Sequence, residues 1–482
     1  MPTGPVCLVY EGEHRMSTVL ELKNRRELFL DDFITESVSG DMRKVLHEPV
    51  PHDPDPTAPR GAYQTVLCHQ GKLYRYYRGD FSDYTRLGRP ELFDVKPGFI
   101  GEFTGFAESR DGHRWMKPDA RIYDCGIPNV VFCNSPRYLT HNLTPFLDVN
   151  PACAKDARFK ALAGTADSGG MFALFSPDGI SWTVQGDEPV FKSPGPRFGY
   201  LFDSQNVSFY SEAEGRYVCY FRVNCTKDDR HLRSIARIDS EDYLHWEHFQ
   251  ELDVNLPDEN LYVSQLQPYF RAPQFYIGTP TRFFEDRGSA TDIGFLFSRE
   301  GGPIRRTWRE AWIRPGFDKA SWSNRYNYLA CGIVPTSPNE ISLFHNWNGV
   351  RYSLRYDGFV SYSSFYEGGE WLSRVLRYTS GELELNAATS TGGFVQVELQ
   401  TPEGIPLPGF SFEESEKMYG NSVSWRPRWK SERSLEPGTA LRIALRSRES
   451  EFYSFSFTEE KEKEDRGTVL ILSAGDKKIA NS

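Results

Sequence analysis

The sequence predicts an all-β protein, on three observations. The 482 residues include 25 Tyr, 34 Phe, 40 Gly and 31 Pro, a composition that favours short strands and tight turns over long helices. Apolar runs such as Asn129–Cys133 are short, and none approaches the ~18 residues that a membrane span requires. Two kinds of segment also recur along most of the chain, which indicates a repeat architecture.

The first recurring segment is a tight turn that ends in Trp. It reads SRDGHRW at 109–115 and SPDGISW at 176–182, with looser copies at 240–246 and 298–301. Its acidic positions 111, 178, 242 and 300 are spaced by 67, 64 and 58 residues. Asp-Gly forms a hairpin turn, Ser caps it, and we expect the Trp to pack between sheets. We therefore assign Asp111 and Asp178 to folding and not to a site.

The second recurring segment is an aromatic strand that follows a polar turn and a short apolar strand. Its copies are Gly71–Tyr77, Ala157–Leu162, Gly215–Phe221, Ala272–Ile277 and Asn339–Phe344. Five units of four-strand size predict a five-bladed β-propeller. Four or six blades stay open if an end unit is miscounted.

The pattern changes near residue 357. Apolar and polar residues alternate over 372–399, 440–445 and 452–457, which predicts half-buried strands at the spacing of a β-sandwich. The charged run 459–465 then predicts a solvated connection to a last strand at 468–472. The expected domains are an N-terminal extension (1–25), the propeller (26–356) and a C-terminal β-sandwich (357–482).

Charge and cysteine usage restrict the partners. A net charge of −10 without a basic run argues against nucleic acid, and no membrane partner is expected. The eight Cys form no CxxC pair, which predicts free thiols. Residues 1–15 lack a signal-peptide pattern, so we expect a cytoplasmic protein. Met16 is an alternative start of the protein. The ten His show no HxH or HxxxH pairing and no phosphate loop is present, so we expect neither metal nor cofactor. The oligomeric state stays open.

Several segments resemble a known superfamily. They are Arg26–Asp32, Ala107–Gly112, Phe202–Val207, Pro268–Pro273 and Glu398–Gln400. Over residues 26–457 the chain resembles the five-bladed glycoside hydrolases of the fructosidase and arabinanase type (families 32 and 43). The resemblance implies a propeller followed by a sandwich, and hydrolysis of a small glycoside or oligosaccharide. The superfamily's Trp-Asn-Asp-Pro and Arg-Asp-Pro segments are absent, and the nearest acids are Asp53, Asp55 and Asp148.

Glycoside hydrolysis requires a proton-donating acid and a second carboxylate. Asp203 is the first candidate, because the polar segment 203–206 leads into the apolar strand 207–210. Glu108 stands inside a predicted strand, where an acid is unusual unless it faces a polar site. Asp148 lies in a long irregular stretch, and loops on a rigid scaffold commonly carry function.

A second set of residues is expected to bind the sugar, because guanidinium, amide and carboxylate groups match its hydroxyls or acid groups. This set comprises Arg222, Arg271, Asn324, Arg325, His141, Glu259 and Asp292. Two alternatives remain: a non-catalytic carbohydrate-binding or scaffold propeller, and a lyase or sialidase-like enzyme for acidic sugars. Two carboxylates close together would favour the hydrolase, and an arginine cluster with a Tyr would favour the acidic-sugar enzyme.

Overall fold

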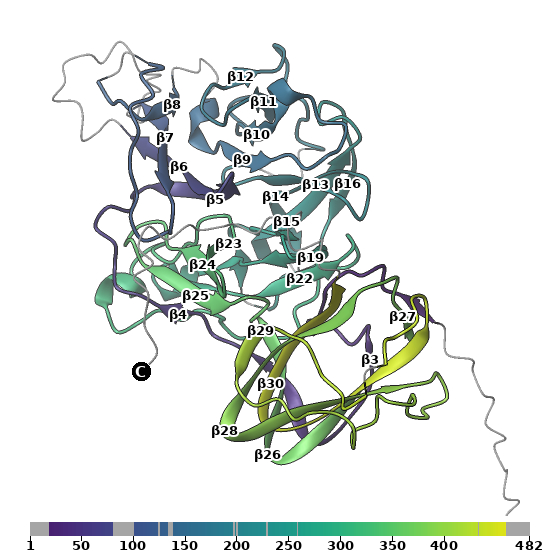
Figure 1. Cartoon of the computed structure of the whole chain (residues 1–482). Helices are drawn as coiled ribbons and strands as arrows, with labels where there is room; N and C mark the ends of the chain where they lie inside the picture. The colour runs from purple at the N-terminus through teal and green to yellow at the C-terminus, as the bar shows by residue number, and fades with distance from the viewer. Residues whose placement is uncertain are drawn as a thin grey trace, which may run out of the picture. The chain divides into compact units, whose positions relative to one another are not determined.

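The computed structural model describes residues 19–80, 101–123, 126–133, 138–195, 198, 201–227, 230–257, 259–431 and 433–458. The predicted strand at 468–472 and the charged run before it lie outside these residues. Within them the protein is all-β, as predicted (Figure 1). The helical elements here are 3-10 turns: η3 (Leu139–His141), η4 (Lys155–Ala157), η6 (Glu285–Arg287) and η7 (Lys319–Trp322). No helix in this part of the chain has the length and apolar character to cross a membrane.

The chain divides into two compact units, described separately below. One unit comprises residues 46–359, and the other combines residues 19–45 with 360–458 of the described chain. The sequence-based domain limits differ from this division, because residues 26–45 were assigned to the propeller. In the structure Glu27 and Leu28 pair with Phe455 and Ser454, so this segment belongs to the sheet of the C-terminal unit.

The 46–359 unit begins with a meander of four antiparallel strands. They are β5 (Ala62–His69), β6 (Lys72–Asp80), β7 (Glu102–Ser109) and β8 (Val130–Phe132). Gln70 and Gly71 join β5 to β6 with φ of 48° and 73°, the left-handed conformation that a two-residue hairpin turn requires. This turn sets the register of the first two strands.

Two further meanders follow with the same strand order. The first contains β9 (Thr144–Leu147), β10 (Phe159–Ala163), β11 (Phe172–Ser176) and β12 (Thr183–Val184). The second contains β13 (Val207–Ser211), β14 (Arg216–Lys227), β15 (Arg230–Ser240) and β16 (Trp246–Glu251). Each aromatic strand identified from the sequence is the second strand of its sheet.

The next repeat is divided into two three-stranded sheets. One contains β17 (Asn260–Leu261), β20 (Thr281–Phe284) and β21 (Ala290–Ile293), and the other β18 (Gln267–Tyr269), β19 (Ala272–Gly278) and β22 (Leu296–Arg299). The last sheet of the unit combines distant segments: β23 (Val334–Ser337), β24 (Glu340–Phe344), β25 (Arg351–Arg355) and β4 (Val50–Pro51). The start of the unit therefore hydrogen-bonds to its end, through Ser353 opposite Val50.

The first strands of successive sheets lie side by side. β5 is next to β9, β9 next to β13, β13 next to β18, and β23 next to β5. A parallel bridge between Thr65 and Cys331 joins the first and last sheets. The described part of the unit contains six sheets, and the five-blade count stays a prediction.

The turn motif is structural, as predicted. In its first copy the Asp111 carboxylate accepts hydrogen bonds from the backbone N–H groups of His113 (2.8 Å) and Arg114 (3.2 Å), and Ser109 Oγ accepts from Gly112 (2.9 Å). The copies at 176–182 and 240–246 repeat these bonds. The Asp side chains are thus used by the backbone and are not free for chemistry.

No disulfide joins the cysteines of the described residues to one another, which agrees with the thiols expected from the sequence. They are Cys68, Cys133, Cys153, Cys219, Cys225 and Cys331. Burial raises the pKa of Cys68 to about 11 and that of Cys331 to about 12. Both are therefore inert thiols at neutral pH.

The second unit is one connected network of eight strands. They are β1 (Leu20–Glu21), β2 (Glu27–Leu28), β3 (Thr35–Leu46), β26 (Val360–Ser373), β27 (Leu376–Arg377), β28 (Glu382–Gln400), β29 (Asn421–Trp425) and β30 (Ala440–Thr458). Register shifts after Asn386 and Thr389 bend the long strand β28. Phe29, Trp371 and Phe452 pack together in its core. A β-sandwich stays the prediction for this unit.

Candidate functional site

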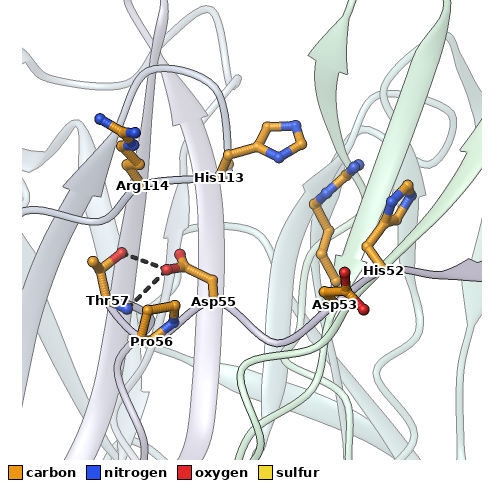
Figure 2. Close-up of a pocket in the computed structure, with 9 residues that line it drawn as sticks. His52, Asp53, Asp55, Pro56, Thr57, His113 and Arg114 are labelled. Carbon is orange, nitrogen blue, oxygen red and sulfur yellow. Dashed lines mark hydrogen bonds between the residues drawn. The ribbon is translucent and has the colours of Figure 1, made fainter.

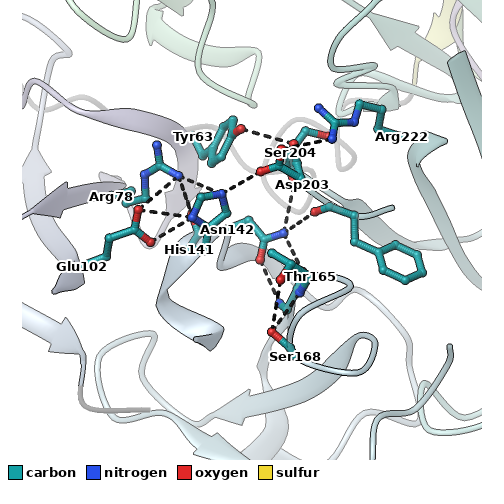
Figure 3. Close-up of polar contacts among 12 residues, drawn as sticks. Tyr63, Arg78, Glu102, His141, Asn142, Thr165, Ser168, Asp203, Ser204 and Arg222 are labelled. Atoms are coloured by element: carbon teal, nitrogen blue, oxygen red, sulfur yellow. Dashed lines mark hydrogen bonds and ion pairs between the residues drawn. The ribbon is translucent and has the colours of Figure 1, made fainter. Parts of the chain in front are cut away.

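Three segments of the 46–359 unit bring together two carboxylates and a histidine (Figure 3). Glu102 is the first residue of β7, His141 is the last residue of η3, and Asp203 lies in the loop before β13. His141 stands between the acids: its Nδ1 is 2.9 Å from Glu102 Oε2 and its Nε2 is 2.9 Å from Asp203 Oδ1. A histidine bonded on both nitrogens to carboxylates donates two hydrogen bonds when protonated.

The proton is held by the histidine. Burial alone would lower the pKa of His141, but hydrogen bonds to Asp203 and Glu102 outweigh it and raise this pKa above its ordinary value. Burial would raise the pKa of each carboxyl, yet the hydrogen bonds from His141 together with the nearby positive charges, Arg78 for Glu102 and Arg222 for Asp203, outweigh it, and both pKa values are lowered. These shifts favour a proton on His141 over a proton on either carboxyl, although the charge of Arg78, whose Nη1 lies 3.0 Å from both ring nitrogens, acts to lower the pKa of His141.

Two arginines complete this polar group. Arg222 Nη2 donates to Asp203 Oδ2 at 3.2 Å, and its own side chain is only 4% exposed. Arg78 Nη1 lies 3.6 Å from Glu102 Oε1 and donates to the carbonyl oxygen of His141 at 3.3 Å. The Arg78 guanidinium stacks 4.6 Å above the ring of Tyr63, whose hydroxyl faces the Asp203 carbonyl at 3.4 Å. Burial raises the pKa of Tyr63 well above its usual range, so this Tyr is a neutral hydroxyl.

The loop that carries Asp203 is held by other side chains. Asn142 is buried and donates to the carbonyls of Gly164 (2.7 Å) and Phe202 (2.6 Å). Asn206 donates to the carbonyls of Phe202 (3.1 Å) and Ser204 (2.9 Å). The capping of this turn is therefore done by the two amides. The Asp203 side chain, 32% exposed, is left to meet His141, Arg222 and solvent.

An arginine–tyrosine cluster adjoins Arg222. It consists of Tyr262 with the guanidinium carbons of Arg222, Arg233 and Arg325 at 5.0, 5.9 and 5.9 Å from the ring centre. Arg222 is paired with Asp203, and Arg233 is paired with Glu285. Arg325 forms no ion pair or side-chain hydrogen bond with any described residue. The cluster therefore presents an uncompensated positive charge.

The structure does not bring Glu108 or Asp148 to this site. Glu108 is near the far end of β7 from Glu102, roughly 20 Å away at ~3.3 Å per strand residue, and it pairs with Lys72 at 3.0 Å. Asp148 is fully buried, where it pairs with Lys160 and accepts from the Tyr217 hydroxyl at 2.8 Å. No substrate reaches a carboxylate enclosed in this way. Both acids have structural partners that account for them.

The seven predicted binding residues divide into those that lie at this site and those that pair with other residues of the fold. His141, Arg222 and Arg325 gather around Asp203 or Tyr262, and Asn324 is exposed next to Arg325 in the sequence. The other three are engaged in buried or half-buried ion pairs, which are Arg271 with Asp357 (3.0 Å), Asp292 with Arg282 (2.6 Å) and Glu259 with Arg306. These pairs explain the three residues as fold-stabilising contacts.

Sequence reasoning missed Glu102, Arg78 and Tyr63. One signal was available for Arg78: it follows the aromatic strand residues of the first repeat as Arg222 follows those of the third. No comparable signal existed for Glu102, because its partner His141 is 39 residues further along the chain. Such a contact depends on how neighbouring sheets pack.

A hollow of about 350 Å³ lies near the first turn motif, at residues 109–115 (Figure 2). It is lined by His52, Asp53, Asp55, Pro56, Thr57, Gly112, His113, Arg114 and Arg351. Asp53 and Asp55 were the nearest acids to the blade-one segment of the resembling superfamily. Asp55 Oδ1 accepts from the N–H (2.8 Å) and the hydroxyl (2.7 Å) of Thr57, so it caps its own loop. Within the described residues, no group of three His, Cys, Asp or Glu is placed to hold a metal.

Comparison with known proteins gives likeness at the level of architecture only. No family model and no curated protein matches the chain. Among solved structures it is similar to a glycoside hydrolase family 43 arabinoxylan arabinofuranohydrolase from Bacillus subtilis (TM-score 0.35, 12% identity, 83% of this chain and 96% of that one). It is also similar to a β-1,2-mannobiose phosphorylase from Listeria innocua (0.42, 10%, 69% and 96%) and a glycosyl hydrolase from Bacteroides ovatus (0.39, 14%, 69% and 97%). At these TM-scores the likeness does not indicate an activity, so the activity is inferred below from the residues of the site.

Proposed function

We propose that the protein is a glycoside hydrolase for a small glycoside or oligosaccharide, with Asp203 and Glu102 as its carboxylate pair. The observation that carries the proposal is the placement of these two acids on opposite sides of His141, each at 2.9 Å. Asp203 is the more exposed of the two, at 32% against 16%. We therefore assign Asp203 as the base that activates the water attacking the anomeric carbon.

The roles follow from where the proton resides. The glycosidic C–O bond breaks, and the leaving oxygen takes a proton from the His141–Glu102 pair. A water molecule adds to the anomeric carbon and gives its proton to Asp203, so one water is consumed and charge is conserved. Two 2.9 Å hydrogen bonds on opposite sides of one imidazole place the carboxylate oxygens roughly 7–8 Å apart, a separation in the ~6.5–9.5 Å range of inverting enzymes. Because the imidazole fills this gap, the attacking water must reach Asp203 from its solvent-exposed side.

We further propose that residues 46–359 form five blades, with β17, β20 and β21 as an addition to the fourth. This is supported by the side-by-side first strands and by the pairing of β4 with β25. Closure by strands from both ends of a unit is typical of radial repeats. The site residues then come from the first three blades and from the loops that join them.

A lyase for acidic sugars is the second candidate, because Tyr63, His141 and Arg78 lie together. Such an enzyme requires a group that can accept the proton next to the carboxylate, and His141 could do so only in its neutral form. The raised pKa of His141 disfavours that role. The hydrolase is therefore the better match to the electrostatics of the site.

The test compares three variants on a panel of aryl glycosides and oligosaccharides. Asp203→Asn and Glu102→Gln keep shape and remove charge, and each should lower turnover at least ~100-fold. Because Asp203→Asn also removes the ion-pair partner of the buried Arg222, its melting temperature is measured as well, and turnover is compared at a temperature at which both variants are folded. Glu108→Gln is the matched control, since it lies on the same strand as Glu102 and should retain activity.

Other outcomes decide against the proposal. Wild-type turnover in Asp203→Asn would remove this residue from the chemistry. Unsaturated products, detected by their ultraviolet absorbance, would establish the lyase. Binding of sugars without turnover of any of them would establish a carbohydrate-binding propeller.

A further inference from the structure

The arginine–tyrosine cluster contains donors without acceptors. The Arg325 guanidinium and the Tyr262 hydroxyl make no hydrogen bond to any described residue. Arg222 Nε is buried and has no hydrogen-bond partner there either. A buried donor left unpaired costs about 1–3 kcal/mol. Arg222 Nε is the buried donor of the three, and the exposed Arg325 guanidinium adds a positive charge with no carboxylate partner among the described residues. Together they indicate an acceptor that comes from outside the protein.

The charges at the cluster indicate what kind of acceptor this is. Arg222 and Arg325 both lie within 6 Å of the centre of the Tyr262 ring, and the carboxylate partner of Arg222 is shared with His141. Asp203 neutralises Arg222, whereas Arg325 has no carboxylate partner among the described residues, so an anion bound here would be attracted mainly by Arg325. An anion with two acceptor oxygens matches a guanidinium in the bidentate manner.

Arg325 is also held in place for such a contact. Its backbone has a φ of 52°, in the left-handed region that costs free energy for a residue with a side chain, and its N–H donates to the Ser289 carbonyl at 2.9 Å. Its guanidinium lies 5.6 Å from the centre of the Phe283 ring as well as near Tyr262. A surface arginine with free rotamers would not need this anchoring.

We infer that the substrate carries a carboxylate, as a uronic acid residue does, and that Arg325 binds this carboxylate with Arg222 and the Tyr262 hydroxyl beside it. The inference rests on the proposed function, because it names the sugar class that occupies the same site. The link between the two is Arg222, which contacts Asp203 on one side and Tyr262 on the other. The carboxylate of the sugar then lies on the Tyr262 side and the glycosidic bond on the Asp203 side.

The test uses pairs of methyl glycosides that differ only at C6. Methyl glucuronide is compared with methyl glucoside, and methyl galacturonide with methyl galactoside, by calorimetry on the full-length protein. We expect a uronide to bind at least ~10-fold more tightly than its neutral counterpart, as a charge-assisted bidentate contact allows. Raising the salt concentration should weaken uronide binding and leave neutral-sugar binding unchanged.

Arg325→Gln should abolish the preference for the uronide. Arg287→Gln is the matched control, because Arg287 is also exposed and stacks 5.7 Å over Phe284, the neighbour of Phe283 that points to the opposite face of β20. This control should keep the preference. Equal binding of uronide and neutral sugar, an unchanged preference in Arg325→Gln, or no uronide binding at millimolar concentration would each overturn the inference.

The two proposals fail separately. If Asp203-dependent hydrolysis is found but uronides have no advantage, the substrate class is wrong and the hydrolase stands. If uronides bind through Arg325 and no glycoside is cleaved, the binding site stands and the hydrolase is wrong.

Discussion

Asp148 provides the sharpest test of which acids serve the fold. Its side chain is fully buried, and that of Lys160, its ion-pair partner, is 5% exposed. Lys160 also donates to the Ala157 carbonyl at 3.0 Å and lies 5.1 Å from the centre of the Phe175 ring. Asp148→Asn keeps the volume and removes the negative charge, which leaves the ammonium of Lys160 enclosed without compensation.

The expected magnitude follows from that stranded charge. Breaking a buried pair by removing one partner typically costs about 3–5 kcal/mol, and we expect this loss in the unfolding free energy of Asp148→Asn. Equilibrium urea unfolding followed by tryptophan fluorescence measures it. Asp119→Asn, which breaks the exposed pair with Arg121, is the control and should cost less than about 1 kcal/mol.

A second variant separates charge from packing. Replacing Lys160 by Met in the Asp148→Asn background removes the stranded ammonium and keeps an unbranched side chain against Phe175. This double variant should recover most of the lost stability, because apolar replacements of buried pairs are often neutral. The reasoning is refuted if Asp148→Asn loses under about 1 kcal/mol while glycoside turnover falls more than ~100-fold. That result would return Asp148 to the chemistry.

The remaining predictions concern packing, titration and turns. Trp115→Ala should lower the unfolding free energy by about 3–5 kcal/mol, because this ring is 5% exposed; Trp182→Ala should cost less, because Trp182 is only half-buried. The folded pKa of His141 is raised, so its contribution to stability is full below the unfolded pKa and is lost as the pH rises through the folded one. The stability difference between wild type and His141→Gln should therefore be largest below the ordinary histidine pKa of about 6.5 and shrink as the pH rises above it, and a difference that stays constant with pH would contradict the shift. Asp178→Ala should cost about 1–2 kcal/mol in chemical denaturation, as loss of a cap does, and a change within 0.3 kcal/mol or so would show that the turn does not depend on its carboxylate.

The sequence by itself determined the all-β class and the turn motif. Asp-Gly turns and aromatic strands are encoded within about ten residues, because hairpin conformation and alternation depend on near neighbours. The sequence also proposed Asp203, from the polar segment that leads into an apolar strand, and His141 as a binding residue, and both stay predictions as site residues.

Only the tertiary structure decided which acids meet. Asp148 looked like a loop acid available for catalysis, but the β9–β10 hairpin brings Lys160 to it and encloses both. Glu102 gave no local signal, yet β7, which begins at Glu102, packs against η3, and the carboxylate reaches His141. Residues 26–45 read as the start of the first domain, while their hydrogen bonds go to strands beyond residue 360. The reason is the same in each case: side-chain pattern is a property of a short segment, whereas a pair of charges depends on strand register and on the packing of sheets that are distant in the chain.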